Sequence, residues 1–188
     1  FLIVILSIIT PIQVIILPLY LRYSSLNMLG TWVPLIVPTF FGYGLKGGLF
    51  IFIYRQYFLG LPKEYIEAAK IDGCGFIGTF YRIILPTSKS PTLVVTVLSM
   101  IWHWNDYFEP TFYIRKQSLH MLTMRLPLIY SLFKATGKPD PITNMPINVY
   151  NEAVFMAATF LVIAPLLIFY LILQRQFVEG IERTGHVE

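Results

Sequence analysis

A charged segment interrupted by glycine, residues 64–86, carries the residues of this 188-residue chain that are best suited to chemistry. It holds three carboxylates, two adjacent alanines and a glycine, namely Glu64, Glu67, Ala68, Ala69, Asp72 and Gly73. Carboxylates on a short helix offer charge to a basic partner, and small residues let another backbone approach closely. This combination favours binding of another protein over catalysis.

The same segment predicts two short helices joined at Gly73. Leu61-Pro62-Lys63-Glu64 is typical of a helix start, because proline suits the first helical position and an early carboxylate complements the helix dipole. Gly73 ends this helix, since glycine enters the left-handed conformation without strain. A second helix is expected from Gly75, and Pro86 is expected to stop it.

Long apolar runs flank the segment on both sides. The chain is 56% hydrophobic and 13% charged, whereas soluble domains are about 45–50% apolar and about 25% charged. Four runs predict membrane-spanning helices, at residues 1–20, 32–54, 92–107 and 153–174. The predicted fold class is therefore an all-α polytopic membrane protein with a helix-turn-helix loop at 60–90.

Three stretches carry a resemblance to a known family. Residues 64–86, with Glu67-Ala68-Ala69, Gly73 and Leu85-Pro86, resemble the EAA loop of permease subunits of binding-protein-dependent ABC importers. Trp104-Asn105-Asp106-Tyr107-Phe108-Glu109-Pro110 and Leu173-Gln174-Arg175-Gln176-Phe177-Val178-Glu179-Gly180 resemble sequences of carbohydrate-type permeases similar to the maltose-type family. The final residues, 184–188, depart from the small residues and lysine that usually end this family.

The resemblance implies the transmembrane subunit of an ATP-driven importer of sugars or related polyols or sugar phosphates, which works by alternating access. It implies an ATPase-coupling role for Glu64, Glu67, Ala68, Ala69, Asp72, Gly73, Leu85 and Pro86. The implied partners are a dimer of ATP-binding cassette ATPases, a second permease subunit, an extracytoplasmic solute-binding protein and the lipid bilayer. No cofactor is expected in this chain, because ATP and Mg would be bound by the ATPase, and the chain is not expected to be an enzyme.

The resemblance also suggests how much of a subunit is present. Family members usually have six spans with the EAA loop between the fourth and fifth, whereas two predicted spans precede it here. Residues 1–188 are therefore expected to be a single permease domain that lacks spans one and two. Four spans place both ends on one side of the plasma (inner) membrane, and the resemblance makes that side cytoplasmic.

The distribution of basic residues favours this orientation only slightly. The loop 55–90 and the tail hold seven Lys or Arg residues, and the opposite loops hold six.

Four residues are candidates for the translocation path: Lys46, Trp102, Asn105 and Asp106. A charge within a span is costly and usually faces a cavity, a partner or the interface, so Lys46 either lines the path or is accommodated at a glycine-rich helix break. At helical spacing Trp102, Asn105, Asp106 and Glu109 would share one face. The alternative is that these carboxylates cap a helix end in contact with solvent.

The remaining patterns exclude or leave open other functions. The sequence contains no metal-binding or nucleotide-binding motif, its single cysteine, Cys74, excludes an internal disulfide, and its scattered basic residues do not suggest nucleic-acid binding. A secondary carrier or channel remains an alternative. Ser88-Lys89-Ser90 could suggest the Ser–Lys dyad of an intramembrane hydrolase, although these serines suit helix caps better. Dependence on ATP separates the importer from these alternatives.

Overall fold

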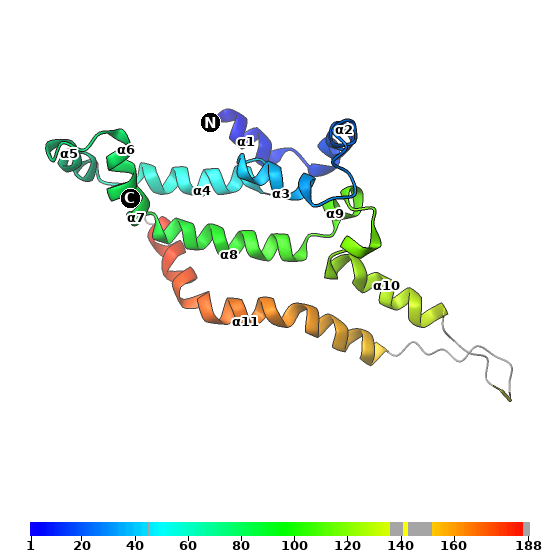
Figure 1. Ribbon diagram of the computed structural model, residues 1–188. Helices are drawn as coiled ribbons and strands as arrows, with labels where there is room; N and C mark the ends of the chain where they lie inside the picture. Colours follow the sequence, from blue (N-terminus) through cyan, green and yellow to red (C-terminus); the bar gives the residue numbers. More distant parts are fainter. Residues whose placement is uncertain (45, 136–140, 143–151, 186–188) are drawn as a thin grey trace. The chain divides into compact units, whose positions relative to one another are not determined.

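The computed structural model describes residues 1–44, 46–135, 141–142 and 152–185, and over these residues its regular secondary structure is entirely helical. Figure 1 labels the helices in chain order: α1 Leu2–Ile9, α2 Ile12–Ser25, α3 Val33–Phe40, α4 Gly47–Leu59, α5 Lys63–Ile71, α6 Phe76–Thr79, α7 Leu85–Thr87, α8 Lys89–Asn105, α9 Phe108–Tyr113, α10 Leu122–Ala135 and α11 Glu152–Gly185. A π-helical turn, Phe80–Ile84, joins α6 to α7, and a 3-10 turn, Gln117–Leu119, precedes α10.

The chain divides into two compact units, each built from segments that are distant in sequence. One unit contains Phe1–Ile12, Thr39–Trp102 and Tyr170–Glu188, and the other contains Gln13–Pro38 and His103–Phe169. The prediction of a single permease domain over 1–188 stays a prediction.

The predicted first span, residues 1–20, is not one continuous helix. Helix α1 ends at Ile9 because Pro11 follows Thr10, and a residue before proline is disfavoured in the helical conformation. Thr10 is extended, with φ −69° and ψ 118°, and its hydroxyl donates to the carbonyl of Leu6 at 2.7 Å. The predicted span is therefore broken at Pro11, because this proline ends the helix instead of only bending it.

The predicted second span, residues 32–54, is also interrupted. The structure ends α3 at Phe40 and begins α4 at Gly47. Between them Gly42 and Lys46 have positive φ angles of 71° and 62°. The glycines here permit the break and a close approach, because a Cβ on Gly47 would lie 2.6 Å from the carbonyl oxygen of Gly42.

The two later spans agree better with expectation. Helix α8, Lys89–Asn105, covers most of the predicted 92–107, and α11 covers all of 153–174. Within α11 the stretch Glu152–Val178 is, by length and composition, able to cross a membrane; its most apolar 18-residue window has a mean hydropathy of 2.6. By this criterion the described residues contain one such helix, or up to three if two bent helix pairs each count as one span.

Two segments that the sequence indicated as a long connection, 105–150, and a polar tail, 174–188, contain helices in their described parts. The long connection predicted after residue 105 contains α9 and α10 in its described part, and the predicted polar tail continues α11 to Gly185. Both were missed because neither pattern carries a strong apolar periodicity. Part of the connection, residues 136–140 and 143–151, lies outside the described residues.

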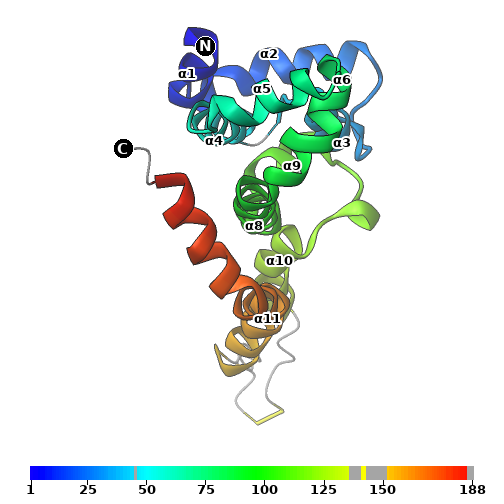
Figure 2. The same cartoon turned by 90° about the vertical axis from the view of Figure 1, so that its left-hand side faces the viewer.

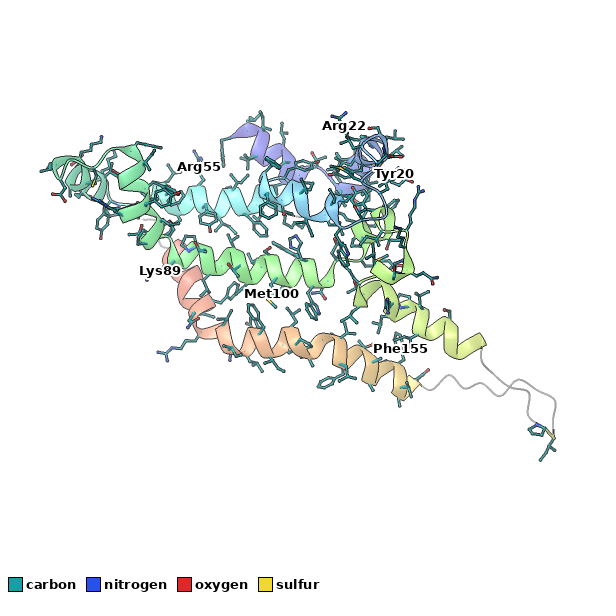
Figure 3. The ribbon with its side chains drawn as sticks, in the orientation of Figure 1. Tyr20, Arg22, Arg55, Lys89, Met100 and Phe155 are labelled. Atoms are coloured by element: carbon teal, nitrogen blue, oxygen red, sulfur yellow. The ribbon has the colours of Figure 1, made fainter. Side chains whose placement is uncertain are left out.

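Aromatic contacts hold each unit together. In the first unit the rings of Phe1 and Phe52 stack with centroids 6.1 Å apart, and the guanidinium of Arg55 lies 3.8 Å from the Phe1 ring centroid. In the second unit Tyr23 meets the ring of Tyr113 edge-on at 5.1 Å. Figure 3 labels Arg55 of α4 and Met100 of α8, two of the helices that flank the loop at 60–90.

Candidate functional site

The turn at Gly73 is a complete Schellman motif. Gly73 has φ +76°, its N–H donates to the carbonyl of Lys70 at 3.0 Å, and the N–H of Cys74 donates to the carbonyl of Ala69 at 2.8 Å. These two bonds satisfy carbonyls that the end of α5 would otherwise leave free. A Cβ on Gly73 would meet no atom within 4 Å. Glycine is thus needed here for its backbone conformation and not for space.

The two alanines of the Glu67-Ala68-Ala69 group have different environments. Ala69 is 1% exposed, whereas Ala68 is exposed. Ala69 lies where α5 packs against α6 and the π-helical turn, and both views place α5 beside α6 (Figures 1 and 2). Because Ala69 is almost fully buried, a larger side chain at this position would have to displace its neighbours. Ala68 remains available to a partner.

The second helix of the segment passes through Pro86, so the expected stop at this residue was wrong. Helix α7 ends at Thr87, one residue beyond the proline. The preceding turn, Phe80–Ile84, is π-helical, and the N–H of Leu85 bonds to the carbonyl of Phe80. A π-helical turn changes which carbonyls need donors, and it accommodates proline, which has no N–H.

The tip of the segment exposes both charge and large apolar side chains. Glu64, Glu67, Asp72 and Pro86 are exposed, and Leu85 is 48% exposed. Three further side chains around the turn, Phe76, Ile71 and Ile77, are 91%, 86% and 71% exposed. We call residues 61–88 the coupling segment. All the residues predicted to couple to the ATPase lie in this segment. Ala69 is buried, and the others are exposed.

Lys46, a candidate for the translocation path, lies at a helix break. It is the residue before α4, and its ammonium lies 5.8 Å from the ring centroid of Trp102. Trp102 also contacts Phe50, with ring centroids 5.7 Å apart. A cation over an aromatic face is stabilised, and more so away from water. This geometry favours the interpretation that Lys46 is accommodated at the break by an aromatic partner.

The face proposed for Trp102, Asn105, Asp106 and Glu109 does not form, because α8 ends at Asn105 and α9 begins at Phe108. Asp106 instead accepts hydrogen bonds from the backbone N–H groups of Phe108 and Glu109, which caps α9. Its own carbonyl accepts a bond of 2.9 Å from the Thr123 hydroxyl. The expectation of capping carboxylates is therefore correct for Asp106, but the side chain is half-buried and not freely solvated.

Burial changes the proton affinity of Glu109. It raises the pKa of the Glu109 carboxyl to about 7, and the nearby charge of Asp106 adds to the shift.

Sequence reasoning missed the role of Trp104. Its indole N–H donates to the carbonyl of Val162 in α11 at 3.0 Å. Val162 lies three residues before Pro165, where a proline-containing helix opens its carbonyls to outside donors. The signal that could have found this contact is a tryptophan donor together with a mid-helix proline, although sequence alone does not pair them.

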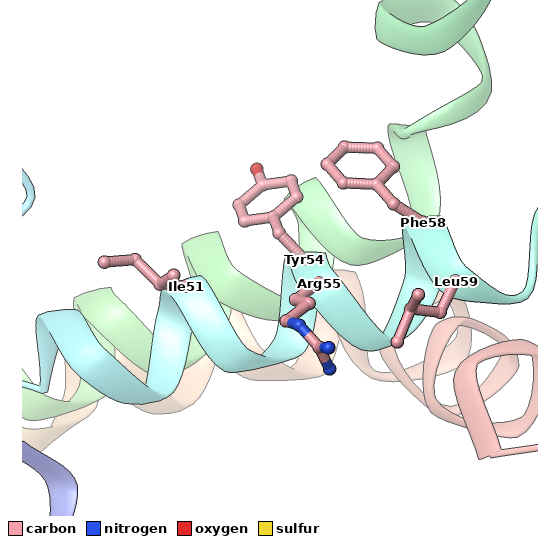
Figure 4. Close-up of a pocket in the computed structure, with 5 residues that line it drawn as sticks. All are labelled: Ile51, Tyr54, Arg55, Phe58 and Leu59. Atoms are coloured by element: carbon pink, nitrogen blue, oxygen red, sulfur yellow. The ribbon is translucent and has the colours of Figure 1, made fainter. Parts of the chain in front are cut away.

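An open depression of about 490 Å³ lies along α4, lined by Ile51, Tyr54, Arg55, Phe58 and Leu59. In Figure 4 the rings of Tyr54 and Phe58 lie on one side of the helix and Arg55 extends from another. Its lining is mostly apolar, and Tyr54 and Arg55 are its polar members.

Comparison with known proteins decides the family. Residues 1–183 match the family described as "Binding-protein-dependent transport system inner membrane component". The chain belongs to this family. The match covers the coupling segment and α8 to α11 together, so the resemblance noted in the sequence is confirmed, and this permease chain is placed in the inner membrane.

Of three relatives, two are named as permease proteins of transport systems. The permease chain is 28% identical over 185 residues to the arabinooligosaccharides transport system permease protein AraQ of Halalkalibacterium halodurans, covering 98% of this chain and 59% of that protein. It is 30% identical over 181 residues to the sn-glycerol-3-phosphate transport system permease protein UgpE of Yersinia enterocolitica, covering 96% and 58%. It is 32% identical over 167 residues to Protein LplC of Bacillus subtilis, covering 87% and 54%.

The permease chain thus spans between half and two thirds of the length of these relatives. No solved structure matches it.

Proposed function

We propose that this chain forms part of the transmembrane subunit of an ATP-driven, binding-protein-dependent importer. The supporting observation is the coupling segment, a two-helix unit fixed by the Schellman turn, whose tip exposes carboxylates and large apolar side chains. ATP and Mg would be bound by a separate ATPase dimer. ATP binding shifts the permease between inward-facing and outward-facing states only if the ATPase contacts the two states differently, and those contacts would be made at this segment.

The proposed solutes are sugars, related polyols or sugar phosphates. Two relatives are named for the transport of arabinooligosaccharides and of sn-glycerol-3-phosphate, which are polyhydroxylated compounds. Selection among such solutes would be shared with an extracytoplasmic solute-binding protein. A second permease subunit would complete the translocation path. Each ATPase would bind one coupling segment.

The proposed orientation places residues 60–90 and both ends of the chain in the cytoplasm. The single cysteine of the chain, Cys74, lies in the coupling segment and is partly exposed, so it reports on this orientation directly. A membrane-impermeant maleimide should label it in inside-out vesicles and not in right-side-out vesicles. Labelling only from outside would reject the orientation.

The function itself is tested by recruitment of the ATPase. Glu67 is exposed on α5 and unlike Ala69 does not pack inside the segment, so Glu67→Lys changes the docking surface without disturbing the fold. Charge reversal at a contact adds repulsion as well as losing attraction, and we expect about a tenfold loss of ATPase affinity. The measurement is co-purification of the ATPase with the permease.

Glu152→Lys is the matched control, because Glu152 is also exposed and lies in the first turn of α11. Glu109 is less suitable because its carboxyl is half-buried. Equal recovery of the ATPase with Glu67→Lys and Glu152→Lys would place the docking surface elsewhere.

A further inference from the structure

The coupling segment enters α8 through a bend. The helical stretch Phe76–Thr87 meets Lys89–Asn105 at an angle of 66°. Pro91 is part of the cause, because the carbonyl of Thr87 would normally accept a bond from the N–H of residue 91, and proline has none. Sharp helix bends of this kind arise where the ladder of backbone hydrogen bonds is interrupted. A joint with a missing bond would flex if nothing replaced the missing donor.

A tyrosine from α4 supplies the missing donor. The hydroxyl of Tyr57 donates to the carbonyl of Thr87 at 2.5 Å, across 30 positions of sequence. This carbonyl is the one that Pro91 leaves without its helical partner. An unsatisfied carbonyl is costly where water is scarce, so the tyrosine both satisfies the group and ties the bend to α4.

A second tyrosine holds the other side of the bend. Tyr54 lies three residues before Tyr57, so both side chains extend from neighbouring positions on one face of α4. Its hydroxyl donates to Thr92 Oγ1 at 2.9 Å, and the Thr92 hydroxyl in turn donates to the carbonyl of Ser88 at 2.6 Å. Ser88 lies at the bend itself and is only 2% exposed. Both paths of hydrogen bonds therefore begin on α4 and end on the two residues that form the joint.

We propose that Tyr54 and Tyr57 form a clamp that fixes the bend between the coupling segment and α8. They are positioning residues: their hydroxyls bond to Thr92 and Thr87 within the chain, and they make movement of the coupling segment turn α8 instead of bending the joint. All the residues of the clamp belong to one compact unit. The role rests on the proposed function, because it supposes that the coupling segment is moved by an ATPase.

The stiffness of the joint can be measured by distances between spin labels. In a Cys74→Ser background, labels at Ile77 and Met100 place one probe on the exposed tip and one on α8. The sample is the complete transporter with its ATPase in lipid nanodiscs, without nucleotide and then with ATP and vanadate. We expect a narrow distance distribution in the parent protein in both conditions. Tyr57→Phe removes only the hydroxyl. It should increase the width of the distance distribution about twofold, because the coupling segment would then move relative to α8.

Tyr170→Phe is the matched control, since it removes a tyrosine hydroxyl from α11, outside the clamp. It should leave the distribution unchanged. A Tyr57→Phe distribution as narrow as that of the parent would overturn the proposal, as would equal broadening in Tyr170→Phe.

A second comparison keeps the test decisive if Tyr57→Phe assembles poorly. Tyr54→Phe removes the donor of the bond between Tyr54 and Thr92, and Thr92→Val removes its acceptor together with the bond from Thr92 to Ser88. If the clamp acts through the bond between Tyr54 and Thr92, the double variant should broaden the distribution no more than the stronger single variant, whereas additive broadening would overturn the proposal. The width of the distance distribution in the sample without nucleotide can be measured whether or not the ATPase binds. Loss of co-purified ATPase therefore tests the proposed function, and the width alone tests the clamp.

Discussion

The coupling segment and the residues around the end of α8 each contain a short helix beside a turn, yet their large side chains differ in exposure. We call residues 103–114 the junction segment. In the coupling segment Phe76 is 91% exposed and Ile71 is 86% exposed. In the junction segment Tyr113 and Ile114 are each 1% exposed, and Pro110 is also fully buried. Each region carries one of the motifs that identified the family.

This difference in exposure indicates that the two motifs have different roles. Apart from Ala69, the motif side chains of the coupling segment are mostly displayed, so they are available to act on another molecule. The motif residues of the junction segment act within the chain, because Trp104 bonds to Val162 and Asp106 caps α9. Substitutions should therefore impair ATPase binding in the first region and stability in the second.

The largest expected effect concerns the turn of the coupling segment. Gly73 has φ +76°, a conformation that costs most L-residues about 1–2 kcal/mol and a β-branched residue more. Gly73→Val should abolish both uptake of solute and ATPase co-purification while the protein still inserts into the membrane. Gly73→Asn should keep most of both activities, since asparagine tolerates this conformation and the space beside it is open. Normal uptake by Gly73→Val would show that the turn does not set the docking geometry.

A pair of identical substitutions tests the contrast directly. Ile114→Ala removes a buried side chain and should lower the free energy of unfolding by about 2–5 kcal/mol. Ile71→Ala removes an exposed side chain and should change it by no more than about 0.5 kcal/mol. Thermal unfolding of the purified protein in detergent measures both, and ATPase co-purification should fall for Ile71→Ala. Similar losses of stability in the two variants would contradict the distinction between the regions.

The smallest expected effect is a dependence on pH in the junction segment. Because the folded pKa of Glu109 is raised to about 7 from 4.5, this carboxyl favours the folded state fully below pH 4.5. That contribution is lost as the pH rises through 7, so the unfolding temperature should fall between pH 5 and pH 8, a range chosen to bracket a pKa of about 7. Glu109→Gln should flatten this slope, whereas Glu67→Gln, on the exposed segment, should not. Equal slopes in the parent and Glu109→Gln would show that Glu109 does not titrate in this range.

The sequence predicted the elements whose cause is local. The end of α5 at a glycine follows from a φ angle that other residues avoid, and its two hydrogen bonds span only a few residues. The apolar helix at 153–174 follows from an uninterrupted run of uncharged, mostly apolar side chains. The predicted spans at 1–20 and 32–54 are each broken, because Pro11 and the glycines around Lys46 end helices that composition alone would have continued.

By itself, then, the sequence determined the family, the helical class and the conformation of the Gly73 turn, since each depends on residue types at short spacing. The tertiary structure alone decided that Ala69 is buried and Ala68 is not, that Trp104 reaches Val162, and that Tyr57 replaces the donor missing at Pro91. These contacts join residues up to 58 positions apart. A hydroxyl or an indole N–H can bond to many carbonyls, and only the packing of helices selects which one lies within reach.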